Sequence, residues 1–181
     1  MSSSSTTKQA AALGMSLEDF TQYNHLAVLM EAFHSRLRDQ FMVLRKAATT
    51  RALPRGYSSR AFIDGGLRFC QSLAMHHAIE EEYVFKDLAV KMPQFRRPED
   101  GGTAPELLAQ HDVMHDGLER LSGYLRRCKS GQEELDWGEL EASLGWGDVL
   151  LAHLDAEVET LGAASMSKYW TLEEMDGFRR Y

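Results

Sequence analysis

Three pairs of metal-binding side chains recur in the sequence, and the two members of each pair are four residues apart. The pairs are His76 with Glu80, His111 with His115, and His153 with Glu157. Residues at i and i+4 lie on the same face of a helix, so side chains from successive turns can converge on one ion. Imidazole and carboxylate groups are common ligands of transition metals. The spacing therefore predicts metal binding by the faces of three helices.

A fourth helix contributes one further histidine, and helical geometry decides which one. His25 and His34 are nine residues apart, which at about 100° per residue places them on opposite faces of a helix. His34 shares its face with the apolar residues Met30 and Leu37. We therefore expect His34 to point into the core and His25 to lie at the surface.

The second helical segment leaves two pairs of candidate ligands open. His76 with Glu80 and His77 with Glu81 both border the apolar sector of this segment. Periodicity alone does not decide between them. Apart from this alternative, we expect Glu81 and Glu82 to face solvent.

The elements that must position these side chains are four segments with apolar residues at steps of three and four. They cover residues 16–48, 58–92, 103–128 and 139–161, and glycines and prolines interrupt the pattern between them. No segment shows the alternating pattern of a half-buried strand. We predict an all-α protein, an antiparallel up-and-down four-helix bundle with a short C-terminal helix from Thr171.

The candidate ligands lie at matching depths along these four helices. At about 1.5 Å of rise per residue their levels agree within roughly two turns, so they can share one layer of the core. Seven ligands are too many for one ion, and two ions bridged by Glu80 and Glu157 account for them. Imidazole-rich sites suit iron, zinc or copper better than magnesium or calcium. A ferritin-type site needs two Glu-x-x-His motifs, and Glu31 with His34 is the one that fits.

Bulk properties restrict the possible partners and the compartment. The 181 residues predict one core, with a flexible leader over residues 1–15, the bundle over 16–162 and an extension over 163–181 that packs on the bundle. A net charge of −7 without a basic stripe argues against nucleic acid. No apolar run is long enough for a membrane or a signal peptide. We expect a cytoplasmic protein in which Cys70 and Cys128 are reduced and buried.

Several motifs together resemble the hemerythrin-like (HHE cation-binding) proteins, particularly a fungal branch of them, over residues 17–175. In sequence letters the motifs are HHAIEEEYVF from His76, LAVKMPQF from Leu88, QHDVMHDGL from Gln110, HLDAEV from His153 and KYWTLEEM from Lys168. In this family a glutamate lies four residues after a ligand histidine, and an aromatic residue lies nine residues after the same histidine. That pattern matches His76, Glu80 and Phe85, so the resemblance favours His76 over His77.

The resemblance implies a non-haem centre of two iron ions held by the seven predicted ligands. It implies a protein that binds dioxygen or another small diatomic ligand, or that acts in iron or redox handling. The alternative is an oxidase or oxygenase that acts on a small organic molecule, peroxide or nitric oxide, and a metal-free interaction module is a third reading. The chain departs from the family at two positions. Lys86 stands where the family usually has proline, and Glu157 lies four residues after His153, whereas oxygen-carrying hemerythrins have an aspartate five residues after the histidine. The second weakens the case for reversible oxygen carriage.

Overall fold

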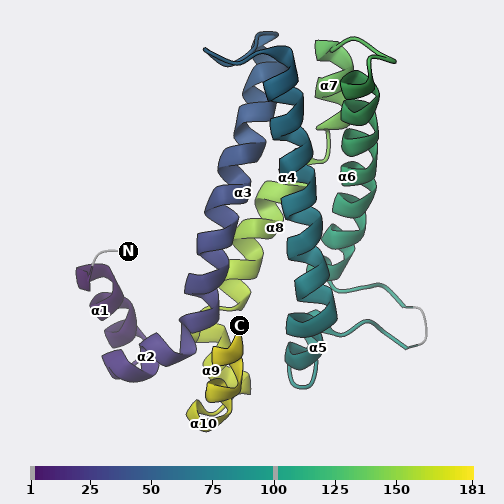
Figure 1. Ribbon diagram of the computed structural model, residues 1–181. Helices are drawn as coiled ribbons and strands as arrows, with labels where there is room; N and C mark the ends of the chain where they lie inside the picture. Colours follow the sequence, from purple (N-terminus) through teal and green to yellow (C-terminus); the bar gives the residue numbers. More distant parts are fainter. Residues whose placement is uncertain (1–2, 100–101) are drawn as a thin grey trace. The chain divides into compact units, whose positions relative to one another are not determined.

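The computed structural model describes residues 3–99 and 102–181 (Figure 1). Every regular element in these two ranges is helical. The chain divides into two compact units. One holds residues 34–153, and the other holds the two ends of the chain, up to residue 33 and from residue 154. The predicted all-α class and helical bundle are confirmed.

The first long predicted helix is interrupted at Asn24 and forms α2, Leu17–Tyr23, and α3, His25–Thr50. Ser16 caps its start, because its hydroxyl accepts a hydrogen bond from the Asp19 backbone N–H (3.0 Å). The Asn24 side-chain oxygen accepts a bond from the Ala163 backbone N–H (3.1 Å). Asparagine side chains that bind backbone groups compete with helical geometry, which accounts for the break.

The second long helix changes its winding at the level of the candidate ligands. Helix α4 covers Ser59–Ile79, and its first turn is capped by the Ser58 hydroxyl. A π-helical turn, η1, follows over Glu80–Val84 and leads into the short helix α5, Phe85–Leu88. Met92 is extended ahead of Pro93, as expected of a residue that precedes proline. A 3₁₀ turn, η2, covers Pro93–Phe95.

Helix α6, Glu106–Ser130, carries the predicted apolar stripe and ends at Gly131 in the left-handed conformation (φ 78°). The last predicted bundle helix is two helices, α7 (Trp137–Ser143) and α8 (Gly147–Thr160). Trp146, in the break, is buried, and its ring stacks on Phe69 with centroids 6.4 Å apart.

Two glycines make room for the aromatic rings around this break. A Cβ atom on Gly117 would lie 2.3 Å from the Trp146 ring, and one on Gly147 would lie 2.0 Å from the Phe41 ring. A Cβ atom on Gly66 would likewise lie 2.7 Å from the Leu125 side chain. These small residues therefore allow close packing of aromatic and leucine side chains in the core.

The unit formed by the chain ends contains helices that the sequence analysis did not predict. Helix α1 covers Ser3–Ala12, within the predicted flexible leader, and α9 covers Ala163–Tyr169. Ala10, Phe20 and Ala163 form a small apolar cluster, so burial of Ala10 accounts for an ordered α1. The residues before Ser3 lie outside the described ranges, and the domain boundaries stay a prediction.

The predicted C-terminal helix begins where expected. Helix α10, Leu172–Met175, is capped by Thr171, and Glu174 completes a capping box with it. The 3₁₀ turn η3 follows over Asp176–Arg180. Gln22 of α2 donates to the Leu172 carbonyl (2.7 Å), which ties the C-terminal helix to α2. Within the described ranges, no helix has the length and apolar character that crossing a membrane requires.

Candidate metal centre

A first group of candidate ligands joins α3 to the end of α4. The Nε2 atoms of His34 and His76 lie 3.0 Å apart. His76 Nε2 is also 2.8 Å from Oε1 of Glu80, the first residue of η1. His34 and Glu80 are fully buried, and His76 is mostly buried. Two imidazole nitrogens and a carboxylate oxygen therefore lie close together inside the bundle.

A second group joins α6 to α8 and meets the same carboxylate. The Nε2 atoms of His111 and His153 lie 3.2 Å apart, and both side chains are buried. His111 Nε2 is 3.6 Å from Oε2 of Glu80. Glu80 thus presents one oxygen to each pair of histidines, and its carboxylate lies between them.

These separations match those of ligands that share an ion. Two nitrogens bound to one ion at about 2.0–2.1 Å, with an angle of about 90–110° between them, lie roughly 2.9–3.4 Å apart. The 3.0 Å separation of His34 and His76 and the 3.2 Å separation of His111 and His153 fall in this range. Little rearrangement would be needed for each pair to hold a metal ion.

The hydrogen bonds that His111 and His153 make through Nδ1 determine which nitrogen of each ring can bind a metal. His111 donates from Nδ1 to Oε1 of Glu81 (2.7 Å), and His153 donates from Nδ1 to Oε1 of Gln110 (3.1 Å). Because both acceptors are oxygens, the Nδ1 atoms carry protons, which leaves Nε2 of each ring as the nitrogen whose lone pair can bind a metal. Two lone pairs that face each other at 3.2 Å repel. A cation between them turns this repulsion into ligation, so these residues fit a metal ion.

Glu81 is an outer partner of the site, contrary to the expectation that it faces solvent. Its side chain is only 38 % exposed. Replacing Glu81 by alanine should weaken metal binding about 10–100-fold, the usual cost of losing the acceptor behind a ligand histidine. The matched control is Glu82→Ala, since Glu82 is exposed and pairs with Lys86 (2.9 Å). Metal titration against a chromophoric chelator measures both, and equal affinities would contradict this role for Glu81.

His115 lies apart from the two pairs. Its side chain is 43 % exposed, and its Nε2 atom is 3.2 Å from Oε1 of Glu81. Among the seven predicted ligands it is the most exposed. Glu157, the remaining predicted ligand, is buried and follows one turn after His153 on α8.

His77 is the functional candidate that sequence reasoning left open, and it lies in the core beside His76. Its side chain is 1 % exposed, whereas periodicity places both histidines at the border of the apolar face. Burial, and after it the neighbouring His111, lowers the pKa of His77 far below its ordinary value. The ring is therefore neutral and can act as a ligand.

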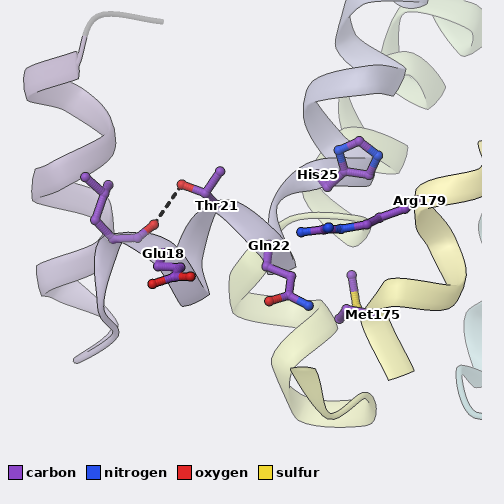
Figure 2. Close-up of a pocket in the computed structure, with 7 residues that line it drawn as sticks. Glu18, Thr21, Gln22, His25, Met175 and Arg179 are labelled. Carbon is purple, nitrogen blue, oxygen red and sulfur yellow. Dashed lines mark hydrogen bonds between the residues drawn. The ribbon is translucent and has the colours of Figure 1, made fainter. Parts of the chain in front are cut away.

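His25 lies at the surface, as predicted. It lines a pocket of about 540 Å³ in the unit formed by the chain ends (Figure 2). The other lining residues include Gln22, Met175 and Arg179, which Figure 2 labels together with His25.

The sequence model of one family, described as the hemerythrin HHE cation-binding domain, matches residues 25–164. The chain belongs to the hemerythrin HHE cation-binding family. The match covers all seven predicted ligands, and this hemerythrin-type chain is accordingly a cation-binding domain. No curated protein and no solved structure gave a significant match.

Proposed function

We propose that this hemerythrin-type chain is a non-haem di-iron protein that binds dioxygen or another small diatomic ligand, or acts in iron and redox handling. The observation that carries the proposal is the position of Glu80. Its two oxygens face separate histidine pairs, 2.8 Å from His76 and 3.6 Å from His111. A carboxylate in this position can bridge two ions and neutralise part of their charge.

Each ligand has a defined role in this proposal. His34 and His76 would hold one ion, His111, His153 and the predicted ligand His115 would hold the other, and Glu80 would serve both. Glu157 is proposed as the second bridging carboxylate, because it follows His153 by one turn of α8 and is buried. When bound, the two iron ions supply one-electron redox chemistry and an open position for a small ligand.

The protein surroundings support this function by controlling charge and water. Glu81 and Gln110 keep the Nδ1 protons in place and leave the Nε2 atoms of His111 and His153 available for metal. Five of the seven predicted ligands are buried, which limits the access of water to the ions. Cys70 and Cys128 are free thiols, and burial raises the pKa of Cys70 to about 12. Free thiols fit the cytoplasmic location that we propose.

The proposal is tested by iron content and optical spectra. Protein reconstituted with ferrous iron in the absence of oxygen should hold two ions per chain. Exposure to oxygen should then produce a new charge-transfer band between the near ultraviolet and the visible. A chain that holds no iron after reconstitution, or that holds two ions without any spectral response to oxygen, nitric oxide or oxidants, would contradict the proposal.

A further inference from the structure

The net charge of −7 is unevenly distributed along the chain. Residues 40–79 contain six lysines and arginines but one acid, so this segment carries a charge of +5 while the rest of the chain is strongly acidic. The segment comprises the end of α3, the connection to α4 and α4 itself, and the connection lies at the top of Figure 1. A local excess of positive charge attracts anionic partners even when the whole chain is negative.

Four cations around this connection are exposed and form no ion pair with another described residue. They are Lys46, Arg51, Arg55 and Arg60. The one acid of the segment, Asp64, pairs with Lys129 (2.8 Å). Arg45 is likewise occupied, because it pairs with Asp148 (2.9 Å). The four exposed charges are therefore available to a partner.

Backbone hydrogen bonds hold the connection in a fixed shape. The Ala52 N–H donates to the Ala47 carbonyl (3.2 Å) at the end of α3. The Tyr57 N–H donates to the Pro54 carbonyl (3.0 Å) and closes a four-residue turn. Gly56, the third residue of this turn, has a φ of 84°, which glycine adopts without strain. An ordered connection presents its side chains without the entropy cost of ordering a mobile loop.

Two side chains with apolar surface lie among these charges. Tyr57 is 47 % exposed, and Leu53 is half-buried. Apolar surface gains free energy by leaving water, and tyrosine is enriched at the level of lipid headgroups. A small soluble anion would engage the cations but would offer no apolar layer to Leu53. The headgroup region of an anionic phospholipid membrane offers both negative charge and an apolar layer.

We propose that the connection between α3 and α4, residues 51–57, is a contact surface for an anionic phospholipid membrane. The basic side chains contact the headgroups, and Tyr57 and Leu53 enter the interface. This peripheral contact requires no helix that crosses the membrane. Acidic residues more than a Debye length of about 10 Å from the lipid oppose it little. Anionic lipids face the cytoplasm, which fits the cytoplasmic location proposed above.

Cosedimentation of the full chain with lipid vesicles tests the proposal. The chain should bind vesicles of phosphatidylcholine and phosphatidylserine in equal parts, and it should not bind vesicles of phosphatidylcholine alone. Because each basic residue near an anionic surface strengthens binding about fivefold, an Arg51→Gln, Arg55→Gln double variant should bind about 25-fold more weakly. The matched control, Arg36→Gln with Arg120→Gln, removes two exposed arginines from α3 and α6 and should bind as tightly as the wild type.

A Tyr57→Ser variant distinguishes a membrane from other anionic partners. It keeps every charge, so its binding to heparin, a polyanion without an apolar layer, should equal that of the wild type. Its binding to the mixed vesicles should be at least about threefold weaker, because less apolar surface leaves water. Circular dichroism establishes that each variant is folded, and Arg60→Gln replaces Arg51→Gln in the double variant if the latter disturbs folding.

The proposal is overturned if the wild type does not bind the mixed vesicles, or if the double variant and the control bind them equally. If Tyr57→Ser leaves vesicle binding unchanged, the contact uses charge alone and the assignment to a membrane is wrong. Tight binding to a single-stranded oligonucleotide would then identify a nucleic acid as the partner. Weaker vesicle binding by the double variant and by Tyr57→Ser, with the control unaffected, supports the membrane contact.

Discussion

A Glu80→Gln variant should lose most of its affinity for both metal ions. The amide keeps the size of the carboxylate but removes the negative charge that faces His76 and His111. Removing a partner behind a ligand already costs about 10–100-fold in metal affinity. Loss of a charged group that serves two ions should exceed this, so we expect a decrease of more than roughly 100-fold. Equilibrium dialysis followed by metal analysis measures the remaining ions per chain.

The control for this variant is Glu82→Gln, which makes the same chemical change two residues away. Glu82 is exposed and pairs with Lys86, so its replacement should leave metal content unchanged. Retention of two ions by Glu80→Gln would show that Glu80 does not bridge them. Loss of a single ion would assign Glu80 to one histidine pair alone.

The helices were predictable because their apolar periodicity reflects burial in the core. The stripe that predicts α6 contains Leu107, Met114, Leu121 and Leu125, and all four are buried. Capping by Ser16 and Thr171 was predictable for a local reason, since a hydroxyl at a helix start binds backbone groups a few residues away. The helix caps depend on residues close together in the sequence, and the apolar stripe depends on a single repeated spacing.

The breaks in the long helices were not predictable from periodicity. Asn24 and Trp146 interrupt helices through contacts with residues distant in sequence, Ala163 and Phe69 respectively. The π-helical turn at Glu80–Val84 has no compositional signal, because its residues fit an α-helical pattern equally well. Such turns occur often at functional sites, and here the turn begins at the proposed bridging carboxylate.

The ambiguity between His76 and His77 has a physical explanation in the structure. Two successive residues at the edge of a buried face can both point inward when a different neighbouring helix supplies a partner for each of them. His76 faces His34 of α3, whereas His77 stacks on His111 of α6. The two histidines are alternatives in the sequence because the partners that distinguish them lie on separate helices. The hydrogen bonds that Glu81 and Gln110 make to His111 and His153 were not predictable for the same reason, since the residues that they join are 30 and 43 positions apart in the chain.

Removing the metal should lower the thermal stability of the chain by a measurable amount. Without ions, the facing Nε2 atoms of His111 and His153 and the nearby Glu80 carboxylate lose the cation that balances them. A ligand present at 100 times its dissociation constant stabilises the folded state by about 2.7 kcal/mol. For a chain of this length each kcal/mol corresponds to about 2–4 °C in Tm. We therefore expect chelation to lower Tm by roughly 5–10 °C.

Differential scanning calorimetry of the metal-loaded and chelated protein measures this shift. The Glu80→Gln variant provides the reference, because a chain that binds little metal should respond little to the chelator. Restoring the metal to the chelated wild type should restore its Tm, which excludes irreversible damage. An unchanged Tm after complete metal removal would mean that the buried histidines and Glu80 are stable without ions. In that case the bundle would be better explained as a metal-free interaction module.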